Sequence, residues 1–226
     1  MHFVAKLEFP PTTIEHVKTE KTAGSCYGVS WTDDDRILCA QNKLVEVRHA
    51  TDLRLDKTTT VKYFTVVHSS IGNCEKFYFK VGSATGRKYI TYSGSHHEPA
   101  QRVLHSEEAK NPNQITHLSA NKDYIASIDY VNRALKVFSS TTDEHLFDIQ
   151  LTDFQSPYGV HLTGDAVLVT DWKGGKLCKY SLTASPEPIW TCTIPNAGGI
   201  TTDESGFIYV TDLDGPLIGI VFPSGK

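Results

Sequence analysis

Apolar and polar residues alternate over short stretches along most of the chain. These stretches are rich in β-branched or aromatic residues and are separated by Gly, Asn, Asp, Ser or Pro, which predicts strands. They are RILCA at 36–40, KLVEVRHA at 43–50, KFYFKV at 76–81, RKYITYS at 87–93, ALKVF at 134–138 and HLFDIQL at 145–151. The best helical window, 106–111, is long enough for one or two turns at most. Many short strands without long helices predict an all-β sandwich, barrel or propeller.

A repeat decides among these folds. An apolar run ends in Asp129, Asp171 and Asp212, which are 42 and 41 residues apart. Nine or ten residues after each Asp comes an aromatic residue, namely Phe138, Tyr180 and Phe222. A period of about 40–45 residues with three or four short strands per unit is typical of a β-propeller blade.

The period divides the chain into five units. They span 24–61, 62–107, 112–152, 154–195, and 196–226 together with 3–20. We therefore predict one domain over 1–226, an all-β propeller of about five blades with four antiparallel strands each. Because the last unit lacks an outer strand, we expect the N-terminal strand to close the ring. A truncated six-bladed ring is the alternative. The closed ring should be monomeric, whereas a truncated ring would expose an apolar edge and associate.

Two of the units carry motifs of a known family. SPYGVHLTGDAVLVTDWKGGKLCKYSL at 156–182 and GGITTDESGFIYVTDLDGPLIGIVFPSGK at 198–226 resemble NHL repeats, in particular those of tripartite-motif-type proteins. The resemblance is good over 112–226, partial over 24–61 and poor over 62–107. It implies a module that recognises a partner, such as the substrate of a ubiquitin-ligase-type system. The chain carries no RING or B-box zinc pattern, so any ligase activity would have to lie elsewhere.

Composition and charge narrow the class of protein. The 226 residues are 39% hydrophobic and 21% charged, which is typical of a globular domain. No apolar run approaches the roughly 20 residues of a membrane-spanning helix. Five cysteines without a C-x-x-C pattern indicate reduced thiols, so we expect a cytoplasmic protein without membrane association. The net charge of −4 makes the chain a weak candidate for sequence-independent binding to nucleic acid.

The repeated carboxylates raise the question of a metal site. Asp129, Asp171 and Asp212 could form a ring around a central channel, but we expect them to hold turns by accepting backbone N–H bonds. Propeller lactonases need six to eight oxygen ligands for calcium, and the sequence does not supply a distinctive set. A solvated loop is the expectation for SGSHHEPAQRVLH at 93–105. We therefore predict no catalytic residues, no metal site and no cofactor.

A binding surface remains as the candidate site. In a propeller, the loops that enter the inner strands and the loops after the second strands gather on one face. Residues there are Tyr27, Arg87, Tyr130, Arg133, Tyr158, Trp172, Lys173 and Lys176, with Lys88, Gln114 and Asn132 beside them. Tyr, Trp and Arg dominate the energetics of protein interfaces.

The sequence thus predicts a non-catalytic platform that binds a protein or peptide on this face. RNA binding is the alternative, because single-stranded RNA sites combine aromatic and basic residues in the same way. A continuous positive patch would favour RNA. A calcium-dependent hydrolase or lactonase is a second alternative.

Overall fold

The computed structural model describes eleven stretches of the chain. They are 26–31, 36–41, 44–49, 51–60, 66–71, 76–83, 86–93, 100–107, 117–130, 132–185 and 187–225. Within these residues the structure is all-β, and it contains no helix long and apolar enough to cross a membrane.

Nineteen strands form five antiparallel sheets in the described part of the chain. The first sheet holds β1 (Cys26–Trp31), β2 (Arg36–Gln41), β3 (Leu44–His49) and β4 (Leu55–Thr60). The second holds β5 (Val66–Ile71), β6 (Lys76–Ser83), β7 (Gly86–Ser93) and β8 (Ala100–Glu107). The third holds β9 (Leu118–Ala120), β10 (Tyr124–Asp129), β11 (Ala134–Ser139) and β12 (His145–Gln150). The fourth holds β13 (Pro157–Leu162), β14 (Ala166–Asp171), β15 (Lys176–Ser181) and β16 (Trp190–Thr193). The fifth holds β17 (Ala197–Thr202), β18 (Ile208–Asp212) and β19 (Ile218–Val221).

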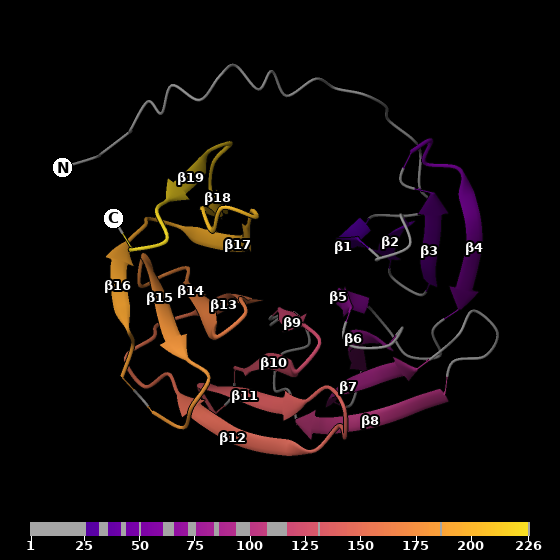
Figure 1. The fold of residues 1–226 in the computed structure, drawn as a ribbon, viewed down its shortest axis with the longest axis horizontal. Coiled ribbons are helices and arrows are strands. Elements are labelled where there is room, and N and C mark those ends of the chain that lie inside the picture. The colour runs from indigo at the N-terminus through magenta and orange to yellow at the C-terminus, as the bar shows by residue number, and fades with distance from the viewer. Residues whose placement is uncertain are drawn as a thin grey trace.

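The sheets are arranged as propeller blades. Each is a meander in which strands adjacent in sequence are paired, and its first strand lies innermost (Figure 1). Neighbouring sheets contact one another through these inner strands, β1 with β5, β5 with β9, β9 with β13, and β13 with β17. The all-β propeller predicted from the repeat is confirmed. The predicted closure by residues 3–20 lies outside the described residues.

The inner strands share a local irregularity. A β-bulge occurs near the start of the pairing between first and second strands in four sheets, for example between Pro157 and Val160 and between Ala197 and Ile200. A bulge bends and twists the strand. In three of these sheets, the first, fourth and fifth, it falls on an inner strand with glycine, and at Gly159 the inner strands β13 and β17 approach closely.

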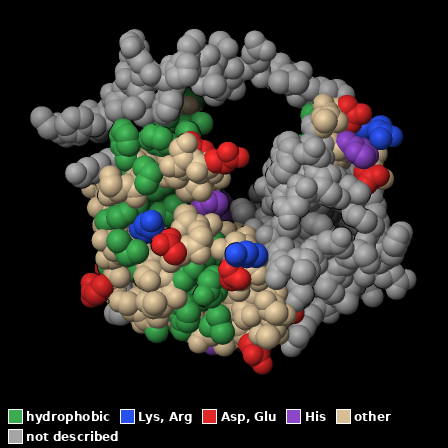
Figure 2. Space-filling model, viewed as in Figure 1, with side chains coloured by type: hydrophobic (Ala, Val, Ile, Leu, Met, Phe, Trp, Pro, Cys, Tyr) green, Lys and Arg blue, Asp and Glu red, His purple; other side chains and the backbone are tan. Residues whose placement is uncertain are grey.

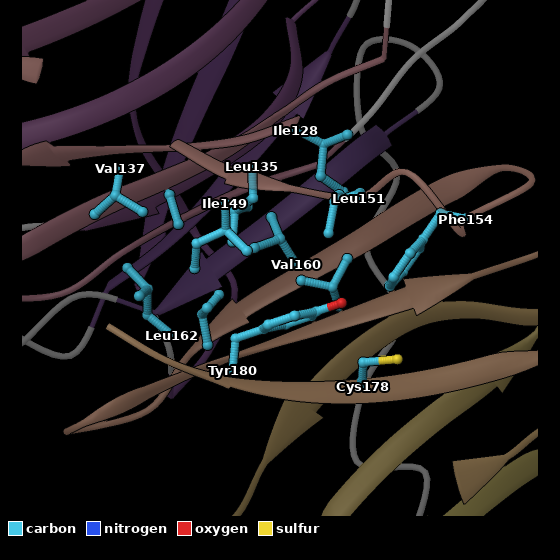
Figure 3. Packing of buried hydrophobic residues seen from close by; sticks show 13 residues of the cluster. Ile128, Leu135, Val137, Ile149, Leu151, Phe154, Val160, Leu162, Cys178 and Tyr180 are labelled. Carbon is cyan, nitrogen blue, oxygen red and sulfur yellow. The ribbon is translucent and has the colours of Figure 1, made fainter. Parts of the chain in front are cut away.

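The core consists of layers between the sheets. Leu135, Val137, Val160 and Tyr180 belong to the cluster between the third and fourth sheets (Figure 3). A second cluster, which includes Leu168 and residues of the fifth sheet, packs on the other side of the fourth sheet. Because both faces of the fourth sheet are covered, β14 is buried along its whole length. This explains why AVLV at 166–169 is a continuous apolar run rather than an alternating one.

Two local predictions are wrong where the structure describes them. Residues 106 and 107 belong to β8 rather than to a helical turn, and His105 lies in the same strand rather than in a solvated loop. The register of the sheet places Arg87 opposite Glu107 and Lys88 opposite Ser106. Pairing with β7 therefore determines this conformation, and it overrides the weak local preference for a helix.

Candidate functional site

The topology brings the predicted binding residues to one side of the propeller. In each meander, the turn after the second strand and the segment that enters the first strand emerge on the same side. We call this side the loop face, and in the well-described blades it consists of residues 130–133, 151–156, 172–175, 194–196 and 213–217.

All the predicted residues that the structure describes lie at or next to the loop face. Tyr130 and Arg133 lie in the β10–β11 turn, and Trp172 and Lys173 lie in the β14–β15 turn. Lys176 begins β15, while Tyr27, Tyr158 and Arg87 are the second residues of β1, β13 and β7. Gln114 lies outside the described residues.

Asp171 holds two segments of the loop face together. Its Oδ2 accepts a hydrogen bond from the backbone N–H of Gln155 at 2.8 Å. Its Oδ1 accepts bonds from the backbone N–H groups of Ser156 at 2.6 Å and Gly174 at 3.0 Å. The side chain is fully buried, so these bonds are not exchanged with water. Asp171 thus fixes the segment before β13 against the turn after β14.

The other two repeat carboxylates also accept backbone N–H bonds in their turns. Asp129 is buried and accepts bonds from the backbone and side-chain amides of Asn132 at 3.0 and 2.8 Å. Asp212 is half-buried, and its Oδ1 accepts a bond from the Asp214 N–H at 2.9 Å. Among the residues described, no group of three or more His, Cys, Asp or Glu side chains is placed to hold a metal ion.

Arg133 is displayed on a constrained turn. Its φ of 47° lies in the left-handed region, which costs a non-glycine residue about 1 kcal/mol. Its backbone carbonyl accepts a hydrogen bond from the Leu151 N–H at 2.7 Å, and this bond links the turn to the segment that enters β13. The guanidinium side chain itself is exposed. The turn therefore fixes the backbone from which this exposed cation extends.

Lys176 differs from the other predicted cations. Its ammonium forms an ion pair with Asp153 and lies 4.4 Å from the centre of the Phe154 ring. Only 18% of its side chain is exposed. Lys176 therefore stabilises the segment that enters β13, and its charge is balanced within the blade.

Trp172 and Lys173 form a small exposed unit. The Trp172 N–H donates to the Ser156 carbonyl at 3.0 Å, which fixes the backbone of the turn. The Lys173 ammonium lies 5.6 Å from the centre of the indole ring, within the range of a cation–π interaction. The indole is half-buried and the lysine is exposed. An aromatic plane and a positive charge are thus presented together.

The loop face also carries residues that the sequence reasoning missed. Leu213 and Leu217 in the β18–β19 turn are 37% and 66% exposed. Exposed carboxylates are present as well, at Asp153 and Asp214. The sequence LDGPL at 213–217 does not mark these leucines as exposed, because a leucine in a sequence predicts burial. The face therefore combines apolar, aromatic, basic and acidic groups.

Three blades meet beside the inner strands near Tyr158. The His117 N–H donates to the Tyr158 carbonyl at 3.1 Å, and the two rings lie 4.7 Å apart. Burial raises the pKa of the Tyr158 hydroxyl, so it stays protonated at neutral pH. A Cβ placed on Gly199 would lie 3.8 Å from the His117 ring. Tyr158 is therefore partly engaged by its neighbours.

His161 couples stability to pH. Its Nε2 lies 3.0 Å from the Thr202 Oγ1, and burial lowers its pKa below the ordinary 6.5. Below about pH 6.5 the unfolded chain takes up a proton that the folded chain does not, so stability falls as the pH falls. When the pH is lowered from about 7.5 to about 5.5, we expect the free energy of unfolding of the wild type to fall by up to about 1 kcal/mol more than that of His161→Gln. Urea denaturation across this range measures the difference, and equal losses in both proteins would contradict it.

The comparisons with known proteins address the fold. No family model matches the chain, and no curated protein matches it. A protein of unknown function from Bacteroides caccae is similar in structure with a TM-score of 0.65 at 12% identity, over 91% of this chain and 81% of that one. A streptogramin B lyase has a TM-score of 0.59 at 13% identity, over 89% and 80%. Virginiamycin B lyase from Staphylococcus aureus has a TM-score of 0.59 at 14% identity, over 89% and 82%. These neighbours are β-propeller proteins, and at such identities the likeness establishes the fold of this chain and not its activity.

Proposed function

We propose that this chain is a non-catalytic recognition platform that binds a protein or peptide through the loop face. The display of Trp172, Arg133 and Leu217 on short turns with fixed backbones carries the proposal. Trp and Arg are the side chains that contribute most at interface hot spots. Because the turns are already ordered, a partner binds without a large cost in conformational entropy.

The charges on the loop face favour a protein partner over RNA. Arg133 and Lys173 are exposed cations, but the carboxylate of Asp214 is exposed on the same face. Lys176 is already paired with Asp153, so its charge is not available to a phosphate. Binding to single-stranded RNA draws much of its affinity from phosphate neutralisation along a positive groove. A mixture of both signs suits the rim of a protein interface, where charge pairs set specificity.

We further propose that the repeat is of the NHL type. The support is the sequence of the units that end in Asp129, Asp171 and Asp212, with their following turns. On this reading the chain is the partner-recognition module of a larger system, for example one that ligates ubiquitin to a bound substrate. The sequence of a peptide selected on the loop face can be matched to a candidate partner protein. The test is whether that protein becomes ubiquitinated.

Replacing Trp172 and Arg133 tests the platform directly. A displayed peptide library is selected on the full chain, and the affinity of a selected peptide is measured by isothermal titration calorimetry. Trp172→Ala with Arg133→Ala should weaken binding about 30-fold, because truncating an interface hot spot costs about 2 kcal/mol. The melting temperature should stay within about 2 °C of the wild type, since Arg133 is exposed and the half-buried Trp172 belongs to a turn whose backbone is held by the bond to Ser156.

A matched control lies on the opposite face. Lys122→Ala with Ile189→Ala also removes one cation and one large apolar side chain, which are 81% and 58% exposed. This variant should bind the peptide as the wild type does. Equal losses in both double variants would contradict the proposal. If the protein instead binds a short oligouridine tightly, with an affinity that decreases steeply at higher salt, RNA recognition replaces the proposed protein partner.

A further inference from the structure

The turns of the third, fourth and fifth sheets form one continuous arc of the loop face. Backbone hydrogen bonds connect each turn to the segment that enters the next sheet, and that segment to its own turn. They join Leu151 to Arg133 at 2.7 Å, Trp172 to Ser156 at 3.0 Å, Ile194 to Gly175 at 2.9 Å and Leu213 to Asn196 at 3.0 Å. The three sheets follow one another around the ring (Figure 1). A partner that crosses this arc therefore meets the three turns in a fixed order.

Each turn of the arc carries a large side chain at the same repeat position. The residue after the repeat carboxylate is Tyr130 in the third sheet, Trp172 in the fourth and Leu213 in the fifth. Tyr130 and Trp172 are half-buried, and Leu213 is 37% exposed. Leu217 adds a second exposed leucine at the fifth sheet, where Figure 2 shows that apolar side chains gather. The arc thus offers an apolar or aromatic contact in every blade that it crosses.

Several charged groups of the arc are already satisfied within the protein. Lys176 forms an ion pair with Asp153. Asp129 and Asp171 are fully buried and accept N–H bonds in their turns. None of these groups is available to pair with a charge on a partner.

The charges that remain are sorted by sheet. Among the described residues of the loop face, three exposed charged side chains have no ion-pair partner, namely Arg133 in the third sheet, Lys173 in the fourth and Asp214 in the fifth. Lys173 keeps its full charge beside the Trp172 indole, since an aromatic ring does not neutralise a cation. Asp212, which is half-buried next to Asp214, adds a second carboxylate in the fifth sheet. The arc is therefore positive over the third and fourth sheets and negative over the fifth.

Given that the loop face binds a protein or peptide, as proposed above, we propose that the partner is an extended segment whose charges are ordered to match this arc. An acidic residue of the segment faces Lys173, with Arg133 beside it, and a basic residue faces Asp214. A large apolar residue between them packs against Trp172 and Leu213. Charges that match across an interface fix the register and the orientation of the partner. Because packed sheets lie about 10 Å apart and an extended chain advances roughly 3.3 Å per residue, the acidic and basic residues are about three positions apart.

Selection of a displayed library of random peptides on the full chain provides the first test. The selected peptides should carry Asp or Glu about three positions from Lys or Arg, with an apolar residue between them. One selected peptide is then titrated by calorimetry at fixed ionic strength. Exchanging its acidic and basic residues keeps its composition and should weaken binding to the wild type at least about tenfold, because like charges then face each other at both ends.

Charge reversal in the protein tests each end of the arc separately. Lys173→Glu should weaken binding of the selected peptide about tenfold, and a peptide with Lys in place of its acidic residue should recover the affinity to within about threefold. Asp214→Lys should have the same effect, and here only a peptide with Glu in place of its basic residue should recover the affinity. The replaced side chains are exposed, so the variants should fold, and circular dichroism checks this.

Two variants on the opposite face serve as matched controls. Lys122→Glu changes the net charge as Lys173→Glu does, and Asp165→Lys changes it as Asp214→Lys does. Both residues are exposed, in the β9–β10 and β13–β14 turns. Both variants should bind the selected peptide as the wild type does.

The outcomes distinguish the charge order from the platform itself. If binding is lost in Trp172→Ala with Arg133→Ala but is unchanged by both charge reversals, the loop face recognises a peptide and the ordered charges are wrong. If a charge change at either end of the peptide restores either variant, net charge rather than charge order determines binding, and the proposal is also overturned. If no selected peptide depends on Trp172 and Arg133, the proposed function is wrong and the charge order fails with it.

Discussion

Asp171→Asn is expected to lower the free energy of unfolding by about 3 kcal/mol. The carboxylate accepts three backbone N–H bonds while fully buried. An amide in its place turns an N–H donor toward at least one of these N–H groups, and each buried group left unpaired costs about 1–3 kcal/mol. Urea denaturation monitored by circular dichroism measures the loss.

The same position in the next blade provides the control. Asp212 is half-buried, and the bond that it accepts from the Asp214 N–H can be accepted equally well by the carbonyl of an asparagine. Asp212→Asn should therefore cost less than about 1 kcal/mol. If the two variants lose the same stability, burial and the bonds to residues 155 and 156 are not what makes Asp171 important.

This contrast shows what periodicity establishes and what it leaves open. The 42- and 41-residue spacing located Asp129, Asp171 and Asp212 and predicted the propeller, because spacing reflects the repeated meander. It did not predict that the first two are fully buried and the third is not. Burial depends on which blade lies against the turn, and the sequence of one repeat does not contain that information.

The positions of the candidate-site residues could be predicted from the sequence, but their contacts within the protein could not. The topology alone places Trp172 and Arg133 at the loop face, since both follow second strands. The pairing of Lys176 with Asp153 was not predictable, because it joins residues 23 positions apart through the entry to β13. Leu217 was missed because a leucine in a sequence predicts burial, and only the structure shows that this one is exposed in its turn.

Gly159→Ala is expected to destabilise the protein by about 3 kcal/mol. A Cβ at this position would lie 2.5 Å from the Gly198 carbonyl oxygen and 2.7 Å from the Thr170 Oγ1. Neither atom moves away easily. The Thr170 hydroxyl donates to the Gly198 carbonyl at 2.7 Å and accepts from the Gly159 N–H at 2.8 Å, so it ties β13, β14 and β17 together in a fully buried position. Thermal and urea denaturation measure the loss.

Gly164→Ala isolates the steric cause of that effect. No heavy atom lies within 4 Å of a Cβ at Gly164, in the exposed turn between β13 and β14. Alanine there should change the free energy of unfolding by less than about 0.5 kcal/mol. The added methyl group meets nothing in the folded protein, so its only effect is to reduce the conformational freedom of the unfolded chain. A Gly159→Ala variant as stable as Gly164→Ala would mean that β13 and β17 separate at little cost. The inner strands would then be a loose contact, and the fixed loop face on which partner recognition depends would lose its support.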